Sequence, residues 1–205
     1  SKVGTQPIIG TQINIKFKNE IGIIPIIAKN QKGYETILKL SSDSFLENYD
    51  NSLPYCNIHD LIKNPNGIIV LSGSLNSLAG NLFLKNKSQD LNELYNLLKK
   101  NFEDNFYIEI QRHNDKNEKQ FEQINLNFSN TIKIPIIATH EVYYIDQSMY
   151  EAHDALLCIG EKTYVDETNR KKYSDQHYIR TNDEITKLYS DIPEALENNY
   201  NFHLR

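Results

Sequence analysis

The sequence predicts an α/β fold, in which a mainly parallel β-sheet is surrounded by helices. Short apolar runs rich in isoleucine alternate with longer amphipathic stretches along the chain. Runs of this kind are typical of strands that are buried on both faces of a parallel sheet. The chain has 205 residues, of which 39% are hydrophobic and 24% charged. This length and composition suit a globular protein with one sizeable core.

Five segments have the composition of strands: 7–15, 23–28, 67–71, 106–110 and 134–138. Residues 12–17 alternate between polar and apolar side chains, which predicts an edge strand or a hairpin. Pro25 and Pro135 fit a strand start or an irregular position better than the middle of a central strand, because proline lacks the amide hydrogen.

The amphipathic stretches predict helices over 34–46, 88–98, 117–128 and 148–159. Ser88 is the predicted N-cap of the second of these. Thr181 is followed three residues later by Glu184, which is the spacing of a capping box. Pro193 suits the first turn of a last helix, because that position needs no amide hydrogen.

Strand–helix alternation favours a parallel sheet or a barrel. A closed (β/α) barrel takes about 250 residues and eight strands. Five strands in 205 residues therefore predict either an open sheet or a piece of a larger barrel, and the second is favoured because the chain begins almost directly with a strand. No internal repeat or long linker divides the sequence, so residues 1–205 are predicted to form a single domain.

Net charge and motifs exclude several classes of function. The net charge is −5, whereas a domain that mainly grips DNA carries a basic face. The dense basic spots, 99–100 and 170–172, are interpreted as solvated surface. No apolar run approaches the roughly 20 residues of a membrane span, and the two cysteines lack metal-knuckle spacing, which predicts a cytoplasmic protein. Motifs for nucleotide-binding loops and serine hydrolases are absent.

Active sites of α/β proteins form at the carboxyl ends of the strands. The predicted rim carries His113, His140 and Glu141, with Gln12 and Asn30 as weak neutral donors. A metal-dependent hydrolase needs three or more converging ligands. Because adjacent residues point in different directions, His140 and Glu141 are a doubtful pair for one ion.

The remaining histidines are not expected to bind metal. His153 lies beside the apolar face of a predicted helix, where a hydrogen-bonded packing role is the commoner one. His59, His177 and His203 have no acidic or thiol neighbour at ligand spacing.

Several motifs follow one another in the order and spacing of a known family. They are Pro7–Gln12, Ala28–Tyr34, Gly67–Gly73, Tyr107–His113 and the region from Ile134 to Asn198. Together they resemble the PHP (polymerase and histidinol phosphatase) domain of the bacterial replicative DNA polymerase III alpha subunit. The resemblance implies part of a distorted (β/α) barrel of PHP type. It also implies that the chain is the C-terminal two-thirds to three-quarters of such a domain, without its N-terminal strands.

The resemblance further implies that the family's metal site has degenerated. The family's Glu, His and Cys ligand positions correspond to Gln12, Ile23 and Ser74, and its Asp and His to Glu141 and Tyr143. One conservative change, Asp to Glu, remains among the five. Neutral amide and hydroxyl groups bind hard cations weakly, and isoleucine cannot bind them. We therefore expect no metal or other cofactor, with His113, His140 and Glu141 as the candidates if a rearranged site exists.

A degenerate PHP domain is expected to be structural and to dock partners in DNA replication. The resemblance implies a parent DNA-directed DNA polymerase, a nucleotidyltransferase, whose active site lies outside this chain. The implied partners are the rest of the alpha subunit and the proofreading exonuclease subunit, with DNA bound through the parent polymerase. Abundant Asn, Ile and Lys suggest an AT-rich bacterium. The alternatives are an active metal-dependent PHP phosphoesterase or 3′–5′ exonuclease, and an unrelated α/β binding module.

An unpaired strand edge invites pairing with another chain. If the first strands of the domain are absent, we expect the isolated chain to self-associate through such an edge.

Overall fold

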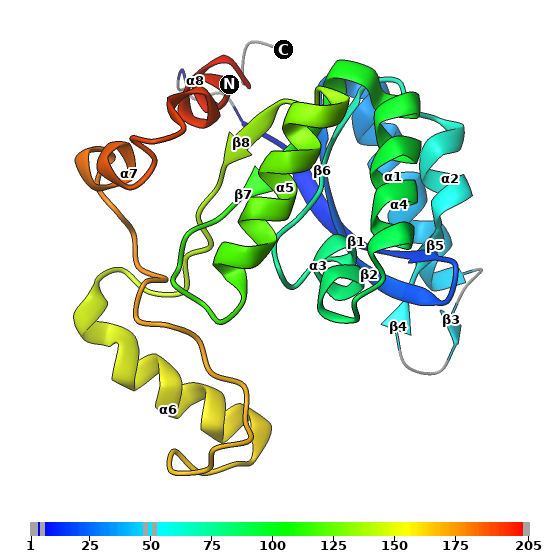
Figure 1. Cartoon of the computed structure of the whole chain (residues 1–205). Helices are drawn as coiled ribbons and strands as arrows, with labels where there is room; N and C mark the ends of the chain where they lie inside the picture. Colours follow the sequence, from blue (N-terminus) through cyan, green and yellow to red (C-terminus); the bar gives the residue numbers. More distant parts are fainter. Residues whose placement is uncertain (1–3, 5–6, 47–48, 51–52, 203–205) are drawn as a thin grey trace.

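The fold is described by a computed structural model, which covers residues 4, 7–46, 49–50 and 53–202. A six-stranded sheet has the order β5-β1-β2-β6-β7-β8 (Figure 1). Its strands are β1 (Gly10–Phe17), β2 (Glu20–Ala28), β5 (Cys56–Asn57), β6 (Ile68–Leu71), β7 (Phe106–Ile110) and β8 (Ile136–Ala138). Parallel pairing joins β5 to β1, β6 to β7 and β7 to β8, whereas β2 is antiparallel to both neighbours. The predicted α/β class with mainly parallel strands is confirmed, and the arrangement is consistent with part of a distorted PHP-type barrel.

The first two strands form an antiparallel hairpin, as the alternating residues 12–17 predicted. Its register runs from Gly10 opposite Ile27 to Phe17 opposite Glu20. The prediction that the strand starts at residue 7 is wrong, because pairing begins at Gly10. A separate two-stranded ribbon is formed by β3 (Tyr49–Asp50) and β4 (Leu53–Pro54).

The expectation for Pro25 is also wrong, because this residue lies in the middle of β2. The described register between β2 and β6 covers Ile26–Ala28 and stops next to the proline. Continuing this register places Pro25 opposite Leu71, the last residue of β6, so the ladder between the two strands ends where the proline lacks an amide hydrogen. Pro135, by contrast, immediately precedes β8, in agreement with the prediction.

Helices pack mainly on one face of the sheet (Figure 1). They are α1 (Gln31–Leu46), α2 (Ile58–Lys63), α3 (Leu78–Leu84), α4 (Ser88–Phe102), α5 (Glu118–Ile132), α6 (Tyr150–Glu161), α7 (Asn182–Leu188) and α8 (Pro193–Phe202), with short 3-10 turns η1 (Glu103–Asn105) and η2 (Gln147–Met149). The main core joins the sheet to all of these helices except α6. A smaller cluster of Ile69, Leu71, Tyr107 and Ile137 lies apart from it, with Phe202 of α8 packed against it.

Of the three predictions about residues at helix starts, two are confirmed. Ser88 is the first residue of α4, and Lys87 occupies the N-cap position without a side-chain hydrogen bond, so the predicted cap is wrong. Thr181 and Glu184 form the predicted capping box, in which each side chain accepts from the other residue's backbone amide. Pro193 is the first residue of α8, as predicted.

One part of the chain stands away from the sheet and is called the α6 arm here, residues 147–178. It consists of η2, α6 and the segment that returns toward α7 (Figure 1). Arg170 joins the return segment to the helix, because its Nη1 and Nη2 atoms donate to both carboxylate oxygens of Asp154 at 2.6 and 2.7 Å. The aromatic rings of Tyr143, His153 and Tyr173 pack together at the base of the arm.

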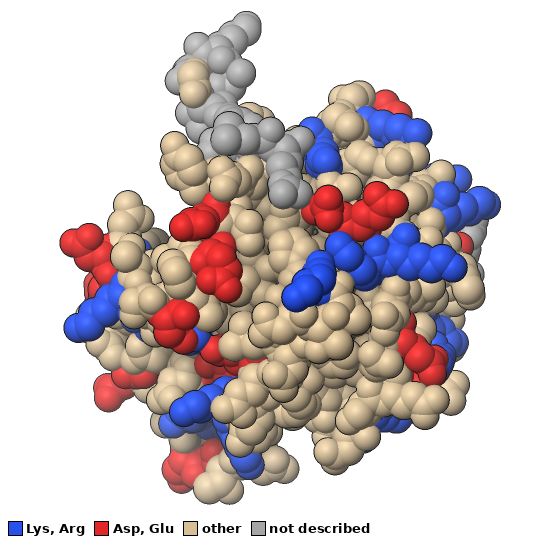
Figure 2. Space-filling model, turned by 45° about the horizontal axis from the view of Figure 1, so that its top comes forward, with Lys and Arg blue, Asp and Glu red and all other residues tan. Residues whose placement is uncertain are grey.

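The surface does not carry a continuous basic field on the face shown in Figure 2, where Lys and Arg side chains lie among Asp and Glu. This agrees with the net charge of −5. In the described part of the chain, no helix combines the length and apolar character needed to cross a membrane.

Candidate functional site

A cavity of about 200 Å³ lies at the carboxyl ends of β6, β7 and β8. Four of the five ligand positions derived from the family resemblance line it: Gln12, Ile23, Ser74 and Glu141. Gln12 and Ile23 reach it from the β1–β2 hairpin, while Ser74 follows β6 and Glu141 follows β8. Tyr143 is not among its lining residues. Its ring instead lies 4.3 Å from that of Tyr173, measured between centroids.

The cavity also contains a buried carboxyl group that the sequence analysis did not select. Glu109 of β7 is 7% exposed. Its Oε1 accepts hydrogen bonds from the Thr139 hydroxyl and, at 3.0 Å, from Gln111 Nε2. Its Oε2 has no hydrogen-bond partner among the described residues. Burial raises the pKa of Glu109, and the charge of Glu141 adds to this effect against the opposing hydrogen bonds.

Sequence does hold a signal for Glu109. It is the one charged residue in an otherwise apolar strand, Phe106–Ile110, all of whose residues are buried. A charged side chain in such a strand is an informative exception, because burying it without a partner is costly.

His140 also lines the cavity, but its nitrogen atoms serve different purposes. Its Nε2 lies 2.8 Å from the carbonyl oxygen of Tyr178, to which it must donate. Its Nδ1 has no hydrogen-bond partner among the described residues. Burial lowers the pKa of His140, and the nearby His113 adds to this effect, although the Tyr178 carbonyl opposes it. The folded protein therefore favours a neutral ring.

His113 lies outside the cavity and forms a stack with two other histidines. Its ring centroid is 4.6 Å from that of His140 and 4.0 Å from that of His177. His113 Nε2 accepts from the backbone amide of Glu141 at 3.1 Å, and its Nδ1 lies 3.2 Å from Glu118 Oε1. His177 has no acidic or thiol neighbour at ligand spacing in the sequence, but the fold brings Asp115 to it, with Asp115 Oδ2 3.4 Å from its Nε2.

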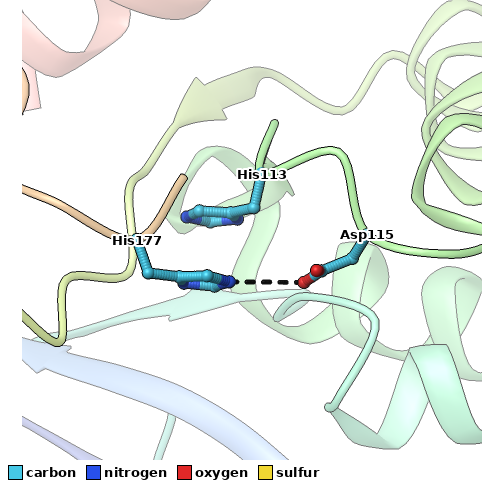
Figure 3. A group of neighbouring side chains, drawn as sticks. All are labelled: His113, Asp115 and His177. Atoms are coloured by element: carbon cyan, nitrogen blue, oxygen red, sulfur yellow. Dashed lines mark hydrogen bonds and ion pairs between the residues drawn. The ribbon is translucent and has the colours of Figure 1, made fainter. Parts of the chain in front are cut away.

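His113, Asp115 and His177 are the one group of three His, Cys, Asp or Glu side chains whose ligand atoms come within 4.8 Å of one another in the described residues. Figure 3 shows the two imidazole rings one above the other, with Asp115 beside the edge of His177. The rings are nearly parallel, at 3°. Nitrogen lone pairs lie in the ring planes, and a zinc ion binds them at about 2.0–2.1 Å. Parallel stacked rings therefore do not direct both lone pairs at one ion.

Hydrogen bonds give this group a different role. Within residues 7–46, 49–50 and 53–202, the Glu141 peptide group connects the two rings, since its amide donates to His113 and its carbonyl oxygen lies 3.1 Å from His177 Nδ1. Asp115 holds the other edge of His177. Burial acts to raise the pKa of Asp115, but the hydrogen bond to His177 contributes to a net lowering. We call His113, Asp115, His177 and the Glu141 peptide the histidine latch. It fastens the end of the α6 arm to the loops after β7 and β8.

The other histidines lie apart from this group or outside the described residues. His153 packs against Tyr143 at 5.3 Å between centroids, in line with a packing role. His59 is exposed in α2. His203 lies outside the described residues.

The pH dependence of stability is expected to report the neutral state of His140. Its folded-state pKa lies below the ordinary value of 6.5, so the unfolded chain binds a proton that the folded chain excludes. His140 should therefore lower the free energy of unfolding as the pH is lowered below that value, whereas Glu109, whose raised pKa makes the folded chain the better proton binder, acts in the opposite direction. Urea denaturation at about pH 7.5 and about pH 5.5 measures this loss.

His140→Gln should show a smaller loss over the same interval than the unmodified chain. His59→Gln, on an exposed residue, should leave the loss unchanged. An equal pH dependence in the His140→Gln variant would contradict the assignment. Asp115 does not interfere, because a lowered carboxyl pKa acts below its ordinary value of 3.8. Glu109 is present in both the unmodified chain and the variant, so the difference between them reports His140.

Comparison with known proteins identifies the family. The PHP domain family matches residues 1–113. The DNA polymerase III subunit alpha of Rickettsia prowazekii is 35% identical over 98% of this chain. The subunits with the same name from Haemophilus influenzae and Borreliella burgdorferi are each 32% identical, over 95% and 96% of it. The chain spans 17–18% of the length of these relatives. The chain therefore belongs to the PHP domain family.

Proposed function

We propose that this chain is the PHP domain of a bacterial DNA polymerase III alpha subunit, in a form that cannot assemble the family's metal cluster. Its role is then structural. It supports the rest of the alpha subunit and docks the proofreading exonuclease subunit during DNA replication. The parent protein is a DNA-directed DNA polymerase, a nucleotidyltransferase whose active site and main DNA contacts lie outside these residues.

The donor set of the cavity carries this proposal. Among the ligand positions that line it, Glu141 supplies a carboxylate, while Gln12 and Ser74 supply a neutral amide and a hydroxyl. Ile23 supplies no donor. Divalent ions such as zinc require several anionic or imidazole ligands for tight binding. Of the two additional groups at the cavity, Glu109 favours its protonated form, which weakens its attraction for a cation. His140 favours the neutral form that can bind a metal, but it adds only one imidazole to the set.

The alternative is an active metal-dependent PHP phosphoesterase or 3′–5′ exonuclease. His113, Asp115 and His177 favour it by residue type. Two features count against it, namely the parallel rings and the prior engagement of both His113 nitrogens. An active site built on this group would require one ring to turn and the Glu141 amide to lose its acceptor.

Metal content of the full-length polypeptide tests the proposal. After dialysis against metal-free buffer, elemental analysis should find less than about a tenth of an equivalent of zinc, manganese or iron, since a site with too few ligands does not retain its ion. A variant with the family's ligands restored (Gln12→Glu, Ile23→His, Ser74→Cys, Glu141→Asp and Tyr143→His) serves as the matched control and should retain more metal.

Two or three equivalents in the unmodified protein would overturn the metal-free assignment. In that case, single substitutions of His113, His140 and Glu141 would identify the ligands. Loss of the metal in His113→Ala alone, with the fold intact by circular dichroism, would place it at the latch.

A further inference from the structure

A stripe of apolar side chains runs along the solvent side of α6. Its members are Met149, Ala152, Leu156 and Ile159, spaced by three, four and three residues. Met149, Leu156 and Ile159 are 41%, 64% and 76% exposed. This spacing places the side chains on one face of a helix, as in seams between packed helices. The stripe contains no charged residue.

The opposite side of α6 is already in contact with the chain itself. Asp154 and Cys158 are its buried residues, and Asp154 forms the ion pair with Arg170 of the return segment. The histidine latch fastens the end of the arm. The arm is thus held in place by its own contacts, and the stripe faces away from them.

Two more exposed apolar residues follow the end of the helix. Tyr164 and Val165, which come after the C-cap at Lys162, are 74% and 59% exposed. Large apolar side chains that gather on an otherwise polar surface mark an interaction site.

We propose that this stripe packs against a segment of the same, longer polypeptide that lies outside these 205 residues. The inference rests on the proposed function, in which the chain is part of an alpha subunit. The chain spans 17–18% of the length of its relatives, so most of such a polypeptide is available as the occupant. Permanent contacts are more apolar than those between proteins that bind and separate. An uncharged stripe therefore fits a contact within one chain better than a docking site for a separate subunit.

Photo-crosslinking in the full-length polypeptide tests the proposal. p-Benzoylphenylalanine is introduced in place of Leu156 and, as a control on an exposed leucine elsewhere, in place of Leu46, which is 81% exposed at the end of α1. Mixing isotopically labelled and unlabelled copies distinguishes crosslinks within one molecule from those between two. We expect position 156 to crosslink to peptides outside residues 1–205 of the same molecule, at sites that position 46 does not reach.

Crosslinks between two copies, to a separate subunit, or to residues within 1–205 would overturn the proposal. A second measurement, hydrogen exchange, tests the same proposal without depending on the crosslinking yield. In the full-length polypeptide, Leu156→Asp should speed hydrogen exchange of the α6 amides about tenfold or more, as expected when a packed helix loses its cover, whereas Leu46→Asp should not. Equal exchange in both variants would also overturn it. The metal measurement above is independent, so the two hypotheses fail separately.

Discussion

Gly33→Ala is expected to destabilise the protein by about 3 kcal/mol or more, because the new methyl group meets backbone rather than a movable side chain. A Cβ atom at this position would lie 1.7 Å from the carbonyl oxygen of Gly67, the closest approach at any described glycine. That oxygen is fixed, since it accepts from the Lys29 amide at 2.8 Å. Gly67 itself has a φ of +84°, in the left-handed region that glycine adopts readily.

Urea denaturation of the purified chain measures this effect. Gly160→Ala is the matched control, because the added methyl at this α6 position meets no atom within 4 Å. There the change should stabilise by up to about 1 kcal/mol, the difference in helix propensity. A Gly33→Ala variant as stable as the unmodified chain would show that α1 can move away from the Gly67 turn.

Arg112→Ala is expected to cost about 3 kcal/mol, because it leaves a partly buried carboxylate without its partner. The guanidinium donates to Glu122 of α5 at 2.6 and 3.0 Å, and to Asp191 at 2.6 and 2.8 Å. It also donates to the carbonyl oxygen of Leu188 at 2.6 Å, at the end of α7. Arg112 and Glu122 side chains are 17% and 16% exposed. One residue thus joins β7's exit loop, α5 and the α7–α8 connection.

Arg112→Lys should recover little of the loss, because an ammonium group cannot reproduce the planar fork that binds two carboxylates. Lys99→Ala is the control. Lys99 lies 3.5 Å from Asp104, whose side chain is 87% exposed, and such surface pairs contribute about 0–1 kcal/mol. Thermal denaturation of the three variants compares them. Full rescue by lysine would mean that charge alone, without the fork, holds these elements together.

Sequence patterns correctly predicted the structural elements that depend on interactions between residues close together in the chain. Alternation in residues 12–17 identified the hairpin, and Thr181 with Glu184 identified a helix start, since both signals lie within a few residues of chain. The position of Pro25 was predicted wrongly, because a proline is tolerated inside β2 only where the pairing with β6 ends. That point is set by the tertiary structure and not by the residues around Pro25. Ser88 was misassigned by one residue, because a serine suits both the N-cap and the first turn.

The candidate site likewise contains one part that the sequence predicted and one part that it could not predict. Residues that follow strands were expected at one rim, and Gln12, Ser74 and Glu141 do line one cavity. Asp115 and His177 are 62 residues apart, and no periodicity connects them, so their contact could not be anticipated. The family resemblance also gave Tyr143 as a ligand position. In the fold, its ring packs instead against Tyr173 and His153 in the aromatic cluster at the base of the arm.

The histidine latch has a consequence for how this sequence can change. At Glu141 the latch uses the amide and the carbonyl of the main chain, which every residue except proline provides equally. The side chain at this position takes no part in the latch. Substitution of this side chain by any residue except proline therefore leaves the hydrogen bonds of the latch in place. A domain built in this way can lose a metal ligand at this position and keep its loops joined.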